Sequence, residues 1–270
     1  MPDRLSGSGI GVRLVRGTTW QLRLFFTALQ FYTRLPVPRR LGFEESWLQP
    51  AVRYLPLVGW IVAALCAAIY RLAIIVWPPA IAVLLSVACG LLLTGALHED
   101  GFADMCDGFG GGANRQRVLD IMKDSRIGVY GAIGIGLLLA LKCVALASMP
   151  SPLVPLALLV AHPASRLFAA SLTWRLDYAR SEGKAAFLSR RMTGGEFSFA
   201  ALTAFAPACL MLASGLVSWK SLATGTFLAA LVCVLLARLF LRRIGGYTGD
   251  CLGAVQQATE VGFYLGLLAC

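Results

Sequence analysis

Four acidic residues stand close together in the stretch His98-Glu-Asp-Gly-Phe-Ala-Asp-Met-Cys-Asp-Gly108. Asp100, Asp104 and Asp107 follow the spacing i, i+4 and i+7, which places them within roughly 60° of one another on a helix. Carboxylates arranged in this way repel one another unless a cation lies between them. Glu99 could approach the same stripe from the side. Oxygen ligands of this kind suit Mg²⁺ or Mn²⁺ rather than zinc. The spacing therefore predicts a divalent metal site.

This acidic stretch is unusual for the chain, which has only 14 Asp and Glu among its 270 residues. Glycines between Gly108 and Gly112 leave backbone N–H groups free to approach phosphate closely. A divalent ion held here would clamp a pyrophosphate and neutralise a departing nucleotide. The predicted ligands of this Mg²⁺ or Mn²⁺ ion, and the candidate catalytic residues, are Glu99, Asp100, Asp104 and Asp107.

Basic residues follow the acidic stretch and allow two interpretations. Lys123 and Arg126 could pair with phosphate oxygens of a substrate, or with neighbouring aspartates as ordinary ion pairs on a helix surface. The sequence leaves this choice open for each residue. The candidate substrate-binding residues in this region are His98, Arg117, Lys123, Asp124 and Arg126.

His162 and Arg166 lie four residues apart inside an apolar segment. A polar pair at membrane depth costs a few kcal/mol even on a lenient insertion scale, so it normally faces the bundle interior or a cavity. A lone histidine could instead join two helices by a hydrogen bond. The arginine beside it favours a substrate pocket, and we expect both residues to bind substrate.

Asp250 and Glu260 lie near the C-terminus. Asp250 is expected at the membrane edge, on the same face as the acidic stretch. Glu260 lies deeper and has no evident partner in the sequence, so helix packing explains it as well as substrate binding does. Both are retained as candidate substrate-binding residues. Lys142 lies near the outer end of its apolar segment and is expected to extend toward the membrane surface.

The elements that must position these residues are membrane-spanning helices. Apolar residues make up 58% of the chain and charged residues 14%, with a mean hydropathy of +0.73, whereas a soluble domain has about a quarter of its residues charged. A spanning helix needs about 20 apolar residues. The sequence predicts an all-α polytopic membrane helix bundle with about seven transmembrane helices. The expected spans are 55–76, 80–97, 128–149, 153–172, 198–217, 222–241 and 253–270.

The connections between these spans alternate between short and long. The short ones, 77–79, 150–152 and 218–221, contain one charged residue, Lys220. The long ones hold many of the 24 Lys and Arg residues that give the chain its net charge of +10. Since basic loops stay on the cytoplasmic side, we expect a multi-pass protein of the inner membrane with its N-terminus and active site facing the cytoplasm. The basic residues do not gather with aromatics on one face, so nucleic acid is not an expected partner.

The N-terminal region divides into two parts. Residues 1–19 are expected to form a poorly ordered tail without the features of a signal peptide. Residues 20–35 are expected to form an amphipathic interfacial helix, which Pro36 ends. Residues 20–270 are then a single membrane-embedded catalytic domain. The eight cysteines lie mostly in apolar runs without zinc spacing, so neither disulfides nor a structural metal are expected.

Four stretches, in order, resemble the cobalamin synthase family, and the similarity runs from about Gln21 to Leu268. They are Ala28-Leu-Gln-Phe-Tyr-Thr-Arg-Leu-Pro-Val-Pro38, His98-Glu-Asp-Gly-Phe-Ala-Asp104 with Asp107-Gly, Ile121-Met-Lys-Asp-Ser-Arg-Ile-Gly128 and Gly246-Tyr-Thr-Gly-Asp-Cys-Leu-Gly-Ala254. Members of this family are adenosylcobinamide-GDP ribazoletransferases. Phe102 stands where the family usually has Leu, an apolar exchange without consequence for the site.

The resemblance implies a Mg²⁺-dependent transfer of the cobinamide phosphate from adenosylcobinamide-GDP to α-ribazole or its 5′-phosphate. GMP is released, and adenosylcobalamin or its 5′-phosphate forms. Carried onto this chain, the acidic stretch would hold the metal and the pyrophosphate. Lys123, Arg126 and Arg117 would offset developing charge, and Asp250 would complete the site. Membrane lipid is the remaining expected partner, and the oligomeric state stays open.

Two other functions are alternatives to this one. CDP-alcohol phosphotransferases also place an Asp-Gly-x-x-Ala motif at a membrane surface, but their pattern needs an Ala-Arg pair that the run Asp100-Gly-Phe-Ala-Asp104 lacks. A transporter would use His162, Arg166 and Glu260 to line a pathway. It usually has paired inverted halves with broken helices, and the sequence has no such pairing.

Overall fold

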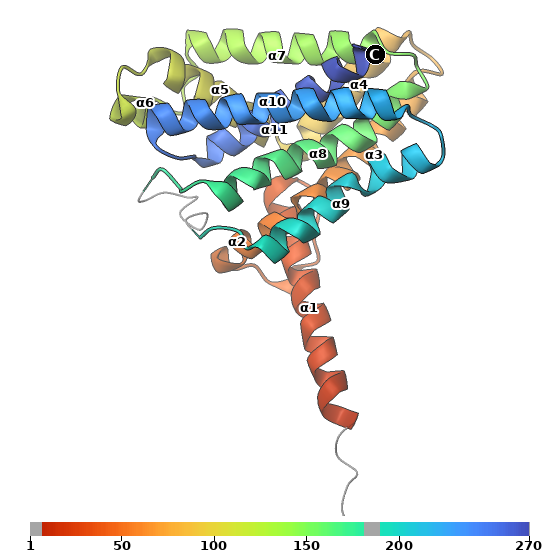
Figure 1. Cartoon of the computed structure of the whole chain (residues 1–270), viewed down its shortest axis with the longest axis vertical. Helices are drawn as coiled ribbons and strands as arrows, with labels where there is room; N and C mark the ends of the chain where they lie inside the picture. Colours follow the sequence, from red (N-terminus) through yellow and green to blue (C-terminus); the bar gives the residue numbers. More distant parts are fainter. Residues whose placement is uncertain (1–6, 181–189, 270) are drawn as a thin grey trace, which may run out of the picture.

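The structure is a computed structural model that describes residues 7–180 and 190–269. Apart from one isolated bridge between Tyr178 and Tyr247, every regular element in these residues is helical (Figure 1). The α-helices are α1 (Gly7–Tyr32), α2 (Leu48–Ala51), α3 (Leu55–Ala73), α4 (Pro79–Thr94), α5 (Leu97–Gly111), α6 (Arg115–Ile121), α7 (Val129–Ala147), α8 (Leu153–Arg175), α9 (Gly194–Ala213), α10 (Trp219–Ile244) and α11 (Gly249–Leu268). Short 3₁₀ turns at Arg39–Leu41, Glu45–Trp47 and Val52–Tyr54 join α1, α2 and α3.

Five segments of the described chain are long and apolar enough to cross a membrane, and the bent pair α4 and α5 makes a sixth if it counts as one broken span. The protein is therefore a multi-pass membrane helix bundle, but the expected number of seven spans is not confirmed. Five of the expected spans correspond to Glu45–Ala73, Val129–Ala147, Leu153–Arg175, Gly194–Ala213 and Trp219–Ile244.

Helix α11 was expected as the seventh span, and it is not among these segments. Its first turn carries Asp250, and Gln256, Gln257 and Glu260 follow, so its average hydropathy is low. Such a polar composition suits a helix that has little contact with lipid. Helices α5, α7, α8 and α10 all pack against α11, and most of its residues are buried. Against α10 the two backbones come close, because a Cβ atom at Gly266 would lie 2.6 Å from the Cα of Gly225.

The chain turns sharply between α4 and α5, whose axes differ by 89°. Gly95 and Ala96 both adopt left-handed backbone conformations there, with φ of 65° and 58°. Glycine takes this conformation at no steric cost, whereas alanine loses about 1–2 kcal/mol. Arg34 lies against the bend: its N–H donates to the carbonyl of Leu93 at 2.7 Å, and its side chain fills the space beside Gly95. The bend therefore sets the direction in which the acidic stretch on α5 runs.

The two ends of the bundle differ, as Figure 1 shows. Helix α6 and the turn from α10 to α11 lie at one end, whereas the short turns after α3, α7 and α9 lie at the other. This agrees with the alternation of connection lengths in the sequence. Helix α1 runs crosswise to the bundle helices, which is the direction that an interfacial helix takes. It begins at Gly7, within the segment expected as a tail; the division into a tail and one domain stays a prediction.

Candidate functional site

The acidic stretch meets the start of α11 where α5 and α11 cross. A Cβ atom at Gly101 would lie only 2.9 Å from the Cα of Asp250, and one at Gly253 only 2.8 Å from the carbonyl oxygen of His98. The two backbones are therefore almost in contact, which glycine alone permits at both positions. As a result Asp250 lies beside the acidic residues of α5, on the same side of the molecule. We call the surface formed by Asp100, Asp104 and Asp250 the acidic face.

Asp104 lies half-buried within this face. The carboxylates of Asp100, Asp250 and Asp107 all act on it as like charges, and Arg180 provides a partial offset. Like charges this close oppose one another's ionisation unless a cation joins them. As the spacing predicts, the charges of Asp100 and Asp107 both act on Asp104. This arrangement favours a bound cation.

Asp107 has a second, structural task. Its Oδ2 accepts a hydrogen bond from the backbone N–H of Gly128 at 2.7 Å, and its Oδ1 accepts one from Gly131 at 2.8 Å. These donors belong to the first turn of α7, where a carboxylate satisfies otherwise unpaired N–H groups and complements the helix dipole. Because both oxygens are engaged, Asp107 attaches α7 to α5. Its predicted role as a metal ligand stays a prediction.

Glu99 and His98 point away from the acidic face into a buried cavity of about 30 Å³. Oε1 of Glu99 accepts a hydrogen bond from Gln257 at 2.6 Å, whereas Oε2 is buried without a hydrogen-bond partner among the described residues. His98 is buried and stacks against Tyr32, with ring centroids 6.2 Å apart. The catalytic and metal-binding roles predicted for Glu99 stay predictions. Its side chain has its partner in the cavity and not on the acidic face.

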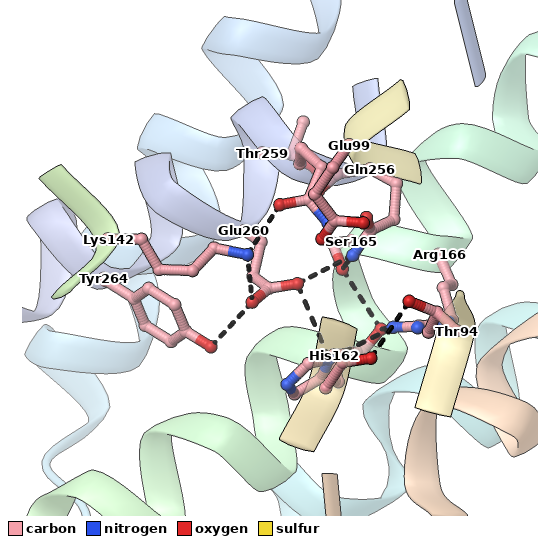
Figure 2. Close-up of polar contacts among 12 residues, drawn as sticks. Thr94, Glu99, Lys142, His162, Ser165, Arg166, Gln256, Thr259, Glu260 and Tyr264 are labelled. Atoms are coloured by element: carbon pink, nitrogen blue, oxygen red, sulfur yellow. Dashed lines mark hydrogen bonds and ion pairs between the residues drawn. The ribbon is translucent and has the colours of Figure 1, made fainter. Parts of the chain in front are cut away.

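Glu260 is the centre of the polar network in this cavity (Figure 2). Its side chain is 1% exposed, and its partners come from three helices. Lys142 of α7 lies 3.2 Å from Oε1, His162 of α8 lies 3.5 Å from Oε2, and Gln256 of α11 donates to Oε2 at 2.7 Å. The hydroxyl of Tyr264 donates to Oε1 at 3.1 Å. Glu260 therefore has the packing partners that were not evident from the sequence.

Lys142 corrects an expectation, because its side chain does not extend to the membrane surface. It is buried and donates to Oε1 of Gln257 at 2.6 Å, in addition to its ion pair with Glu260. A carboxylate inside the bundle is a better partner than a distant membrane surface. The amide of Gln257 then connects this ion pair to Glu99.

Arg166 and His162 face the bundle interior, as expected. Arg166 is 2% exposed, and its Nη1 donates to the carbonyl of His162 at 3.0 Å and lies 3.2 Å from the Nδ1 of the same residue. Lys142 and Arg166 both attract the carboxylate of Glu260. The cavity has room for about two water molecules, far less than the roughly 300–1,000 Å³ of a small-molecule site. The substrate-binding roles of His98, His162, Arg166 and Glu260 stay predictions.

The basic residues after the acidic stretch are mostly exposed. Arg126 donates from Nε and Nη2 to the carboxylate of Asp124, at 3.0 and 2.7 Å. These hydrogen bonds lower the pKa of Asp124 to about 2. The ion pair of Arg126 is present, with Asp124 as its partner, in the connection after α6 rather than on a helix. Substrate binding by Arg126 and Asp124 stays a prediction. Lys123 and Arg117 are exposed, and their predicted role toward phosphate stays a prediction.

Arg180 was missed by the sequence analysis. Its Nη2 lies 3.1 Å from Oδ2 of Asp250, so the acidic face includes a cation from the segment that follows α8. No spacing in the sequence relates these two residues. The backbone hydrogen bonds between 177–179 and Tyr247 bring their segments together.

The comparisons with known proteins decide the family. The family described as Cobalamin-5-phosphate synthase matches residues 24–268. This chain belongs to that family. It is similar to the adenosylcobinamide-GDP ribazoletransferases of Ralstonia pickettii, with 43% identity over 93% of this chain and 96% of the relative, and of Leptothrix cholodnii, with 42% identity over 92% and 96%. The relative from Shewanella frigidimarina, which has the same name, is 41% identical over 92% and 95%.

No solved structure matches this chain. The match to the Cobalamin-5-phosphate synthase family spans the chain from α1 to α11 and includes the acidic face and the buried cavity. As a member of this family, the protein is a membrane-embedded transferase with cobalamin-5-phosphate synthase activity.

The acidic face offers oxygen donors to Mg²⁺. Among the described residues, no group of three His, Cys, Asp or Glu side chains could by itself hold a metal ion. Mg²⁺, however, is usually held by one or two carboxylates together with waters and substrate phosphates. Asp104 with Asp100 and Asp250 offers that kind of donor set, and its negative charges lack full compensation. The residues therefore fit a magnesium ion that is completed by the substrate.

Proposed function

We propose that this protein transfers the cobinamide phosphate of adenosylcobinamide-GDP to α-ribazole or α-ribazole 5′-phosphate and releases GMP. The names of its relatives support these substrates. The observation on which the proposal depends is the half-buried Asp104 among Asp100 and Asp250 where α5 and α11 cross. Because the carboxylates of this face repel anionic phosphates, it would bind them only together with a cation.

The reaction requires one bond to form and one to break at phosphorus. The ribazole hydroxyl oxygen attacks the phosphorus attached to cobinamide, the bond from that phosphorus to the bridging oxygen breaks, and GMP departs. A carboxylate of the acidic face accepts the hydroxyl proton. Asp100, Asp104 and Asp250 would hold the Mg²⁺, which when bound stabilises negative charge on the diphosphate. Lys123 and Arg117 extend this charge compensation to the leaving nucleotide.

The proposal places the acidic face at the cytoplasmic surface of the inner membrane. Its support is the gathering of the basic connections at one end of the bundle, since such loops remain in the cytoplasm. The soluble nucleotide substrate would then reach the site from the cytoplasm, while lipid surrounds the apolar helices.

The direct test uses purified full-length protein in lipid nanodiscs with labelled adenosylcobinamide-GDP and either α-ribazole or its 5′-phosphate. Formation of GMP together with a corrinoid product supports the proposal, and comparison of the two acceptors shows which is preferred. Consumption of CDP-diacylglycerol instead would favour a CDP-alcohol phosphotransferase. Transport of a substrate across sealed vesicles without GMP release would favour a transporter.

Asp104→Asn tests the metal site within this assay. We expect the magnesium concentration for half-maximal activity to rise and kcat to fall by about tenfold or more, because one charged ligand is lost. Asp120→Asn is the matched control, since Asp120 lies on α6 and is hydrogen-bonded to Gln116. If both variants respond to magnesium like the unmodified protein, Asp104 does not serve the metal.

A further inference from the structure

Arg180 reaches into the acidic face with one edge of its guanidinium group partly unused. Nη2 lies 3.1 Å from Oδ2 of Asp250, and the side chain is only 15% exposed. Its Nε is buried and has no hydrogen-bond partner among the described residues. Nε–H and Nη2–H point along the same edge of the planar group, and this edge is the part of arginine that binds two oxygens of a carboxylate or phosphate at once. One of the two donors is therefore available for another oxygen.

The segment that carries Arg180 is held firmly. The N–H of Ala179 donates to the carbonyl of Tyr247 at 2.8 Å, and the N–H of Tyr247 donates to the backbone carbonyl of Asp177 at 3.0 Å. Arg115, at the start of α6, donates to the carbonyls of Ala179 and Ile244 at 2.9 and 2.8 Å. Arg180 thus extends from a fixed backbone, and only its side chain needs to move in order to change partners.

The charge balance explains why the present partner is Asp250. Arg180 acts on both Asp104 and Asp250, while Asp100 repels both of them. A guanidinium group so placed stabilises the acidic face in the absence of another cation. A divalent ion at the same carboxylates would bring a larger charge and would weaken the attraction between Arg180 and Asp250.

We propose that Arg180 exchanges partners during turnover: it neutralises Asp250 in the substrate-free protein and binds a non-bridging oxygen of the substrate diphosphate once a divalent cation occupies the acidic face. This inference rests on the proposed function, because it requires a cation and a diphosphate at the same site. It adds to that function a residue that binds the diphosphate and that competes with the metal.

The first test measures divalent binding without substrate, from the EPR signal of free Mn²⁺ in a titration of the full-length protein in nanodiscs. Arg180→Ala removes the competing cation, so we expect Mn²⁺ to bind about threefold to tenfold more tightly than to the unmodified protein. The same variant should raise KM for adenosylcobinamide-GDP and lower kcat/KM by about tenfold or more, because the diphosphate loses a charged donor.

Two further variants separate this role from a structural one. Arg191→Ala is the matched control: Arg191 forms an exposed ion pair with Asp177 at 2.7 Å between α8 and α9, and its loss should change neither Mn²⁺ affinity nor KM. Arg180→Lys keeps the positive charge but has no planar fork. It should keep Mn²⁺ affinity near that of the unmodified protein while still raising KM, and it remains informative if the alanine variant does not fold.

The failures of the two proposals differ. If Mn²⁺ binds to the unmodified protein and Asp104→Asn weakens it, but Arg180→Ala changes neither Mn²⁺ affinity nor KM, then Arg180 is a structural ion pair and the exchange is wrong. If no Mn²⁺ binds to the unmodified protein, or Asp104→Asn binds it equally well, the proposed metal site itself fails, and the exchange fails with it.

Discussion

Carboxylates that are close in sequence have different partners in this protein. Asp107 is engaged by two backbone N–H groups of α7, whereas Asp104 remains half-buried among like charges. Glu99 contributes to the buried network through Gln257. A carboxylate that has its own donors stabilises the fold, whereas one that lacks them keeps its oxygens available to a cation. On this ground we propose Asp104 as the residue of α5 that serves catalysis.

The buried pair of Lys142 and Glu260 leads to a prediction about stability. Glu260→Leu leaves the ammonium group of Lys142 buried without its carboxylate, and we expect a loss of about 3–5 kcal/mol in the free energy of unfolding. The double variant Lys142→Met with Glu260→Leu removes both charges and should recover most of this loss. Denaturation in detergent, followed by the near-ultraviolet signal of the tryptophans, measures each change.

Tyr264→Phe is the control for this pair, because it removes one hydrogen bond to Glu260 and no charge. Its expected cost is about 1 kcal/mol. If the double variant is as unstable as Glu260→Leu alone, the unpaired charge is not the cause of the loss, and the packing of the glutamate side chain is the better explanation.

At the scale of elements, the site depends on the close approach of α5 and α11. The left-handed pair at Gly95 and Ala96 turns α5 away from α4, and the glycines at 101 and 253 then let α5 lie directly against α11. Asp107 fixes the far end of α5 to α7. Three contacts along one short helix thus determine where the acidic face lies.

Gly101→Ala should separate α5 from α11, because the added methyl group would lie 2.9 Å from the backbone of Asp250. We expect kcat to fall by at least about tenfold, since small displacements of catalytic groups have large effects, with a stability loss of about 1–3 kcal/mol from overpacking. Gly136→Ala is the matched control. It lies within α7 and would meet nothing within 4 Å, so activity should be unchanged. Equal activity of both variants would show that the crossing tolerates displacement.

At the scale of the whole molecule, a polar helix lies inside an apolar bundle. Apolar faces of α7, α9 and α10 are largely exposed, as is required of helices that meet lipid. Helix α11 is surrounded by α5, α7, α8 and α10 and can therefore carry charged and amide side chains. Helix α11 contributes to both the buried polar network and the acidic face, so its displacement would affect both.

The orientation of the bundle is tested by cysteine labelling in cells. We expect Ser125→Cys, in the connection before α7, to react with a membrane-impermeant maleimide only in inverted vesicles. Lys220→Cys, at the start of α10, should react in intact spheroplasts, because the connection before α7 and the start of α10 lie at opposite ends of the bundle. The unsubstituted protein gives the background from its own cysteines. The reverse pattern would place the acidic face outside the cytoplasm.

Several features followed from the sequence because they depend on local composition. Apolar length located most of the spanning helices, since lipid excludes unpaired backbone polar groups over a fixed thickness. Helical spacing placed Asp100 and Asp104 on one stripe, and the cost of burying charge turned His162 and Arg166 inward. The family resemblance was likewise present in the four stretches and is confirmed by the match over residues 24–268.

Other features depended on which helices pack together, which no local pattern specifies. The partners of Glu260 come from α7, α8 and α11, and Arg180 meets Asp250 where 177–179 pairs with Tyr247. Lys142 turns inward because the carboxylate of Glu260 lies inside the bundle. The sequence thus determined the membrane architecture, the family and the acidic stretch. The tertiary structure decided which charges are compensated, because pairing energies depend on distances between segments that are remote in the chain.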